Sequence, residues 1–147
     1  MSDETNDFRR IIERYKAAVF ARDAGDFMRI YHPAVRVFDA WGVWSYEGAP
    51  AWRAAVQAWF SSLGTERVKV SFSELQSTAH HGVTVISAIV TYAAQSEQGE
   101  PLRSMQNRIT WVLRDGDHGF QIVHEHTSAP IAFDDGKAIL TRSREVD

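Results

Sequence analysis

The sequence predicts an α+β fold in which helices pack on one face of a curved antiparallel sheet. Three observations support this class. Apolar residues recur at helical spacing through much of the first 63 residues, whereas from Glu66 onward the apolar period changes to two, which is typical of strands. A turn signal, Asp115-Gly116-Asp117, separates two of the later apolar runs and indicates a hairpin. Helices followed by long antiparallel strands are typical of the α+β class.

Residues 7–22 are predicted to form the first helix, because one face of this segment is apolar and the other is charged. Its start offers three candidate capping side chains, Thr5, Asn6 and Asp7. Asp26 can cap a short second helix over residues 27–31, which Pro33 is expected to stop. Together these two helices are expected to supply the first part of the apolar core.

A short strand over residues 35–40 and an extended segment over 42–47 follow. Gly48 then opens a third helix, which Gly64 ends. The apolar stripe of this helix consists of Trp52, Val56, Trp59, Phe60 and Leu63. Four strands are predicted after it, over residues 68–78, 83–95, 103–114 and 120–128. Residues from Asp134 onward are expected to form a polar, solvated tail.

Composition and charge exclude several function classes. The chain has 147 residues, which fits a single domain over 1–147, with a core expected over about residues 8–130. Its net charge is −3 and it has no basic run, so no nucleic acid and no membrane surface is expected as a partner. It has no cysteine, which excludes disulfides and thiolate chemistry and fits a cytoplasmic location. The polar, acidic N-terminus is unlike a signal peptide.

Three pairs of segments carry a family resemblance: Arg14–Val19 with Ala24–Asp26, Val37–Asp39 with Tyr46–Gly48, and Arg108–Leu113 with Ile122–Pro130. In this order they resemble the nuclear transport factor 2-like superfamily, in particular its SnoaL-like branch. The last pair is also similar to the association domain of calcium/calmodulin-dependent kinase II. The resemblance implies a cone, in which a bent antiparallel sheet wraps around three N-terminal helices and encloses a pocket.

Members of this superfamily include isomerases, dehydratases, epoxide hydrolases and cyclases as well as non-enzymatic assembly domains, so the fold does not decide the activity. We therefore expect a domain that binds a small molecule, with proton transfer beside a carbonyl, or a related hydration or cyclisation, as its chemistry. The alternative is a non-catalytic ligand-sensing or oligomerisation module on the same fold. No cofactor and no metal is needed for either.

Asp39 is the candidate general base. It shares a strand face with Val35 and Val37, so an apolar stripe leads to a carboxylate whose pKa would rise on burial. The placement resembles the proton-transferring Asp of ketosteroid isomerases, which precedes a helix-opening Gly by the same nine residues that separate Asp39 from Gly48. The alternative is a strand-end Asp that accepts a hydrogen bond from a nearby backbone N–H.

Tyr15 and Arg108 are the candidate groups that stabilise developing negative charge. Tyr15 lies on the apolar stripe of the first helix and resembles the isomerase tyrosine that donates to an oxyanion; alternatively it is a core residue bonded to a backbone carbonyl. Arg108 interrupts an apolar strand, and the kinase association domains have an Arg at the matching place facing their cavity. An Arg108 that faces the cavity would favour an anionic ligand. The alternative is that Arg108 forms a purely structural ion pair with Glu125 or Asp39.

The remaining candidate ligand-binding residues are His124, His126, Thr110 and Trp59. His124 and His126 share a strand face, and the register of the kinase domains would set His124 opposite Arg108, with both histidines facing the cavity. Two histidines without a third ligand do not predict a metal site. Trp59, like Trp52, is expected in the core and the cavity wall.

The opposite face of the Arg108 strand is strongly apolar, with Ile109, Trp111 and Leu113 at alternate positions. If Arg108 faces the cavity, these three residues form an apolar outer face, which needs a partner. The sequence therefore predicts a homodimer through this face of the sheet, and Trp111→Glu is expected to split it.

Overall fold

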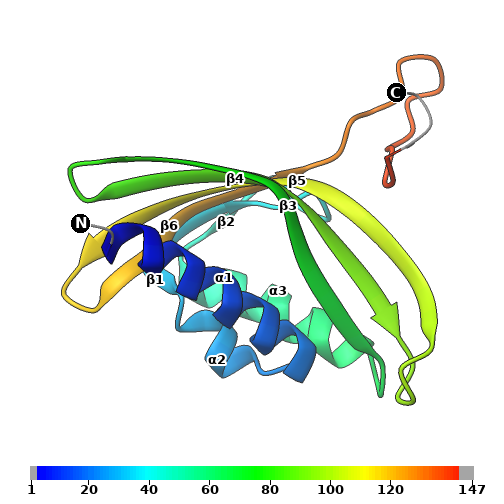
Figure 1. The fold of residues 1–147 in the computed structure, drawn as a ribbon. Coiled ribbons are helices and arrows are strands. Elements are labelled where there is room, and N and C mark those ends of the chain that lie inside the picture. Colours follow the sequence, from blue (N-terminus) through cyan, green and yellow to red (C-terminus); the bar gives the residue numbers. More distant parts are fainter. Residues whose placement is uncertain (1–2, 143–147) are drawn as a thin grey trace.

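In the computed structural model, which describes residues 3–142, a curved six-stranded sheet carries three helices on its concave side (Figure 1). The predicted α+β class and cone-like arrangement are confirmed. In chain order the elements are α1 (Asp3–Ala21), α2 (Ala24–Met28), β1 (Tyr31–Phe38), β2 (Tyr46–Glu47), α3 (Ala49–Ser62), β3 (Arg67–His80), β4 (Val83–Gln95), β5 (Pro101–Gly116) and β6 (Gly119–Ser128).

The helices differ from the prediction at their N-terminal ends. α1 begins at Asp3, so the expected caps lie inside the helix: Thr5, Asn6 and Asp7. α2 begins at Ala24 because Asp23, rather than Asp26, is its cap: the Asp23 carboxylate accepts the Asp26 N–H at 2.9 Å. Pro33 therefore does not stop a helix but lies in β1. It occupies the stretch where the pairing of β1 with β6 shifts register, so the N–H that proline lacks is not needed for a regular hydrogen-bond ladder.

The sheet is mixed rather than wholly antiparallel. Its strand order is β2-β1-β6-β5-β4-β3, and β1 pairs with β6 in parallel while every other neighbouring pair is antiparallel. The chain between β1 and β6 contains α3 and a three-stranded meander, which provides the long connection that a parallel pair requires. This pairing brings the C-terminal ends of β1 and β6 side by side.

The inner face of β5 carries the apolar side chains that the sequence analysis assigned to the outer face. Ile109, Trp111 and Leu113 are buried beneath the helices, with Trp111 0% exposed. Arg108 is exposed on the opposite face and donates to the Ser128 hydroxyl at 3.1 Å. The predicted orientation of β5 was therefore wrong. This orientation buries the aromatic ring and leaves the guanidinium in water, so no buried counter-charge is required.

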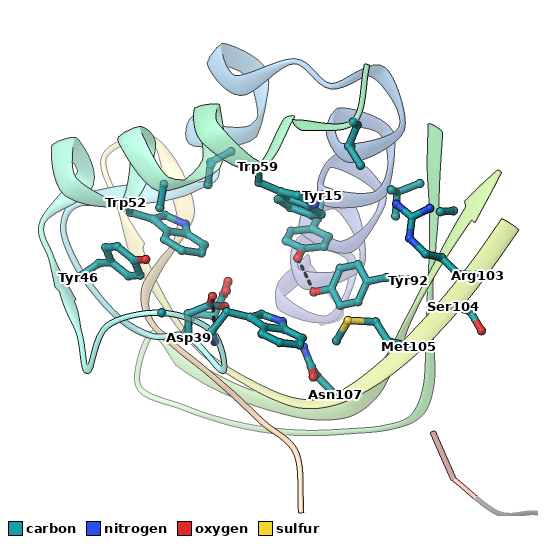
Figure 2. A pocket seen from close by; sticks show the side chains of 18 residues that line it. Tyr15, Asp39, Tyr46, Trp52, Trp59, Tyr92, Arg103, Ser104, Met105 and Asn107 are labelled. Atoms are coloured by element: carbon teal, nitrogen blue, oxygen red, sulfur yellow. Dashed lines mark hydrogen bonds between the residues drawn. The ribbon is translucent and has the colours of Figure 1, made fainter. Parts of the chain in front are cut away.

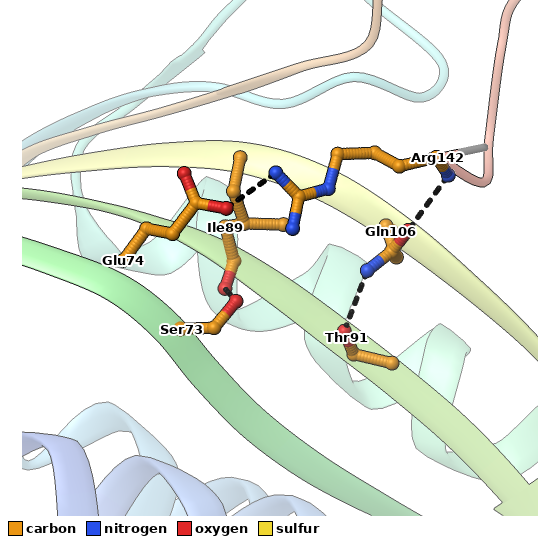
Figure 3. A network of polar contacts seen from close by, with 6 residues as sticks. All are labelled: Ser73, Glu74, Ile89, Thr91, Gln106 and Arg142. Carbon is orange, nitrogen blue, oxygen red and sulfur yellow. Dashed lines mark hydrogen bonds and ion pairs between the residues drawn. The ribbon is translucent and has the colours of Figure 1, made fainter. Parts of the chain in front are cut away.

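The residues after β6 fold back onto the sheet. We call residues 129–142 the C-terminal arm; its residues from Asp134 are mostly exposed, as a solvated tail would be, but they are held in place. The Gln106 N–H donates to the Leu140 carbonyl at 2.6 Å, and the Gln106 side chain accepts the Arg142 N–H at 2.8 Å. Arg142 also pairs with Glu74 of β3 at 2.5 Å (Figure 3). The arm thus lies on the side of the sheet opposite the helices (Figure 1).

Among the described residues, no helix has both the length and the apolar composition that crossing a membrane requires.

Candidate functional site

A cavity of about 530 Å³ lies between the inner face of the sheet and the helices α1 and α3 (Figure 2). This volume fits a small organic molecule. The wall is rich in aromatic rings, which come from α1, α3, β4 and the segment that connects β1 to α3: Tyr15, Trp41, Tyr46, Trp52, Trp59 and Tyr92. Trp59, expected in the wall, lines it from α3.

Asp39 directly follows β1 and lines the cavity. Val35 and Val37, which share its face, are fully buried. The Asp39 carboxylate accepts a hydrogen bond from the Thr127 hydroxyl at 3.1 Å and a longer one from the Trp41 N–H at 3.4 Å. Burial raises the pKa of Asp39 above its ordinary value, and these hydrogen bonds offset part of the rise. Asp39 is therefore a carboxyl group in a poorly solvated position with one side open to the cavity.

Glu125 of β6 is a second carboxyl group in the cavity wall, and its side chain is almost completely buried. Its Oε1 accepts the Tyr31 hydroxyl at 2.5 Å and the Trp111 indole N–H at 2.8 Å. Burial raises the pKa of Glu125 to about 7, although both hydrogen bonds oppose the rise. The negative charge of Asp39 adds to the rise, so the two carboxyl groups influence each other's ionisation.

Tyr15 and Tyr92 form a hydroxyl pair inside the same cavity. Their oxygen atoms are 2.7 Å apart, which joins α1 to β4 across the interior (Figure 2). Burial raises the pKa of both hydroxyls, so both remain protonated at neutral pH. Since one hydroxyl donates to the other, the accepting hydroxyl still has its own proton to donate. The pair can therefore offer one hydrogen-bond donor to a molecule in the cavity.

Positive charge is scarce in the cavity wall. Arg103 is the single Lys or Arg among the described residues that line the cavity, and its guanidinium is bound to Glu66 at 2.7 Å. Asn107 of β5 also lines the cavity, and its buried amide oxygen has no hydrogen-bond partner among the described residues. A buried acceptor without a donor is unfavourable, so a ligand that donates a hydrogen bond there would be stabilised.

Four predicted site residues lie outside the cavity. Arg108 and Thr110 are on the outer face of β5, and His124 and His126 are on the outer face of β6. The predicted register was also wrong: a bulge after Val112 places His124 opposite Val112 and His126 opposite Thr110, while Arg108 lies opposite Ser128. Both imidazole rings instead pack edge-on against Phe38, at 5.1 and 5.4 Å between ring centroids.

The sequence analysis did not name Tyr92 or Glu125 as site residues, although both line the cavity. Tyr92 had a signal, because it continues the alternation of Ile86, Ala88 and Val90, all of which are buried on the inner face of β4. No sequence pattern indicated Glu125, because a bulge between Ile122 and His124 interrupts the alternation of inward and outward side chains in β6. No group of three His, Asp or Glu side chains within residues 3–142 is arranged to hold a metal ion.

Comparison with known proteins agrees with this geometry. The family model for the SnoaL-like domain matches residues 9–132. An NTF2-like protein of unknown function from Pseudomonas putida KT2440 superposes with a TM-score of 0.83 at 22% identity, with 97% of each chain covered.

Two further solved structures share the fold. Aln2 from a Streptomyces species gives a TM-score of 0.76 at 14% identity over 87% of this chain and 91% of that chain. A nuclear transport factor 2-like superfamily protein from Salmonella enterica gives a TM-score of 0.72 at 16% identity, over 94% of this chain and 99% of that chain. Among curated proteins, none matches. The extent of the family match and the shared fold show that this chain belongs to the SnoaL-like domain family of the nuclear transport factor 2-like superfamily.

Proposed function

We propose that the cavity binds an uncharged, largely apolar ring compound bearing a carbonyl group, and that Asp39 and Glu125 move protons on that compound. One observation carries the proposal: two carboxyl groups with raised pKa values share an aromatic cavity of about 530 Å³. A carboxyl group whose pKa is raised towards the pH of the cell can act as a base or an acid there, and Glu125, with a pKa of about 7, is well suited to both.

The roles follow from the surroundings of each group. The carboxylate of Asp39 removes a proton from the carbon beside the carbonyl, while the hydroxyl pair of Tyr15 and Tyr92 donates a hydrogen bond to the oxygen that becomes negative. Glu125, protonated about half of the time near pH 7, returns a proton to the product. The hydroxyl pair takes the part that the sequence analysis assigned to Tyr15 and Arg108. Isomerisation, dehydration and cyclisation beside a carbonyl all use these steps.

The charge balance favours an uncharged ligand over the anion that was expected. Arg108 was the reason to expect an anion, and it lies on the outer face of the sheet. Arg103 is neutralised by Glu66, so an anion entering the cavity would meet two carboxyl groups without a free cation. Neutral aromatic or alicyclic rings fit the wall of tyrosines and tryptophans without this electrostatic penalty.

The experiment compares two probes of similar size, 2-tetralone, a neutral bicyclic ketone, and 2-naphthoate, an anion. We expect 2-tetralone to raise the melting temperature and 2-naphthoate to leave it unchanged. In D₂O the protein should accelerate deuterium exchange at the carbon beside the ketone, as followed by NMR. Asp39→Asn should abolish the exchange and keep the thermal shift, and Arg108→Leu serves as a control that changes neither.

The non-catalytic alternative has its own support, because the groups given catalytic roles already have hydrogen-bond partners within the protein: Tyr15, Tyr92, Asp39 and Glu125. A ligand-sensing module would show the thermal shift with 2-tetralone without any deuterium exchange above that of buffer. That result would contradict the catalytic proposal and favour binding alone. Stabilisation by 2-naphthoate with none by 2-tetralone would contradict the proposed ligand class.

A further inference from the structure

Asn107 is a polar side chain buried in an apolar part of the cavity wall. It is 5% exposed, it lines the cavity from β5 (Figure 2), and its Oδ1 has no hydrogen-bond partner within residues 3–142. The adjacent Gln106, on the other face of the sheet, shows the contrast, because its amide donates to the Thr91 hydroxyl at 3.1 Å and accepts the Arg142 N–H at 2.8 Å. A buried amide oxygen without a donor destabilises the folded chain, so the packing of the chain does not explain why Asn107 is there.

The nearest residues on the inner face of the sheet are apolar. Met105 and Ile109 occupy the inward positions of β5 before and after Asn107, and Val90 of β4 lies directly opposite it. A trapped water molecule is held by about two to four polar partners, and these three side chains supply none. A molecule that fills the cavity is therefore a better partner for the Asn107 amide than a single water molecule.

Other polar groups of the cavity wall interact with one another. The hydroxyls of Tyr15 and Tyr92 form a hydrogen bond at 2.7 Å. The buried indole N–H of Trp52 has no hydrogen-bond partner among the described residues, but it lies near enough to the Tyr31 hydroxyl to oppose the rise of that group's pKa. Asn107 is therefore the polar side chain of the wall that gains most from a hydrogen bond to a ligand.

Among uncharged ligand groups, a hydroxyl matches the Asn107 amide best. Its O–H supplies the donor that Oδ1 lacks, and its oxygen can also accept from the amide nitrogen, which an N–H group cannot do. The last torsion of an asparagine side chain is soft, and no hydrogen bond within residues 3–142 fixes Oδ1. The amide oxygen can therefore turn towards a ligand hydroxyl at low cost.

The position of Asn107 in the sheet sets where that hydroxyl would lie. Two positions before Asn107, β5 pairs with Tyr92 of β4. Two positions after it, β5 pairs with Thr127 of β6, whose hydroxyl donates to Asp39. Along β5, Asn107 is thus between the hydroxyl pair and the proposed base, and successive inward positions of a strand are about 7 Å apart. One hydroxylated ring system can contact all three groups.

We propose that the ligand carries a hydroxyl group in addition to its carbonyl, and that this hydroxyl donates a hydrogen bond to Oδ1 of Asn107. Asn107 then selects hydroxylated ring ketones over unsubstituted ones. The inference rests on the proposed function, because it takes an uncharged ring ketone as the ligand, and it narrows that class. A site built to bond a hydroxyl disfavours the analogue without one, because the polar group of the site then stays buried and unpaired.

Calorimetric titration at pH 7 tests the proposal with three sets of probes: 2-tetralone, the 2-tetralones hydroxylated at each position of the aromatic ring, and the matching methoxy compounds. At least one hydroxylated compound should bind about tenfold more tightly than 2-tetralone. The methoxy compound with the same substitution should show no such gain, because it can accept a hydrogen bond but cannot donate one.

Variants of Asn107 assign the gain to its amide. Asn107→Leu and Asn107→Ala remove the amide with and without filling its space, and each should bind 2-tetralone while reducing the gain from the hydroxyl to less than about twofold. Thr110→Val, a polar-to-apolar change on the outer face of the same strand, is the matched control and should keep the full gain. Circular dichroism confirms that each variant folds.

The outcomes separate this inference from the proposed function. If 2-tetralone binds and exchanges deuterium but no hydroxylated compound binds more tightly, the role of Asn107 is wrong and the proposed function stands. A gain that both Asn107 variants keep, or that the methoxy compound shares, would also overturn the role of Asn107. If none of the probes binds, both proposals fail. Hydroxylated compounds that bind where 2-tetralone does not would support the role of Asn107.

Discussion

Replacing Glu125 by Gln should make the protein more stable than the wild type above pH 7 and nearly equal to it below pH 4.5. Glu125 has a pKa of about 7 in the folded chain, against an ordinary value of 4.5. Between these values the folded protein keeps a proton that the unfolded chain has lost. Folding stability from this group therefore falls as the pH rises through this window, because ionisation is easier in the unfolded chain.

The magnitude follows from the same two values. They differ by about 2.5, and each pH unit of difference corresponds to about 1.4 kcal/mol, so ionising Glu125 lowers the free energy of unfolding by about 3 kcal/mol at high pH. A neutral amide has no such penalty, and its oxygen can still accept the hydrogen bonds from Tyr31 and Trp111. The variant should therefore gain up to about 3 kcal/mol over the wild type by pH 8.

Urea unfolding at one protein concentration, from about pH 4 to about pH 8, measures this difference. Glu66→Gln is the control of opposite sign. The hydrogen bond from Arg103 lowers the pKa of the exposed Glu66 carboxyl, so replacing this carboxylate should reduce stability above pH 4.5, and the reduction should shrink as the pH falls towards 4. A gap between wild type and Glu125→Gln that stays constant from pH 4 to pH 8 would refute the raised pKa and with it the proton-returning role.

Three further outcomes are expected. Trp111→Glu should prevent folding rather than split a dimer, because it places a charge in the core next to Glu125, a loss of more than ~4 kcal/mol that circular dichroism would detect. Arg142→Ala should change the free energy of unfolding by less than about 1 kcal/mol, since its pair with Glu74 is exposed, but should accelerate amide exchange in residues 131–140. Tyr92→Phe should lower the free energy of unfolding by about 1–3 kcal/mol because the Tyr15 hydroxyl loses its partner, and thermal melts would show the loss.

Local patterns predicted the elements of this fold well. The β-branched run over residues 83–95 coincides with β4, and the helix between Gly48 and Gly64 is present as α3. Asp39 lies on the strand face that alternation with Val35 and Val37 predicts, and that face is the buried one. In each case the residues that determine the element and its buried face are neighbours in the sequence, so the pattern within one segment is enough to predict both.

The orientation of β5 could not be derived from the family resemblance. Alternation alone separates Arg108 from Ile109 and Trp111, and the transfer of aromatic surface out of water favours the second set inside. An inward Arg108 would have required a buried counter-ion, and Glu125, one of the two expected partners, is instead held by Tyr31 and Trp111. Where a resemblance and the simple burial rule disagreed, the burial rule gave the correct face.

Glu125 illustrates why the second carboxyl group of the site was beyond sequence reasoning. Its position depends on a bulge between β5 and β6 that changes which residues of β6 point inward. Burial raises its pKa, and its hydrogen-bond partners, Tyr31 and Trp111, lie 94 and 14 residues away in the chain. The parallel pairing of β1 with β6 sets Glu125 opposite Val37, and Asp39 lies two residues after Val37. This strand pairing therefore brings the two carboxyl groups into one cavity. Fold and candidate chemistry therefore depend on one long-range pairing, and a change that shifts the register of β6 by one residue would turn Glu125 outward and remove half of the proposed site.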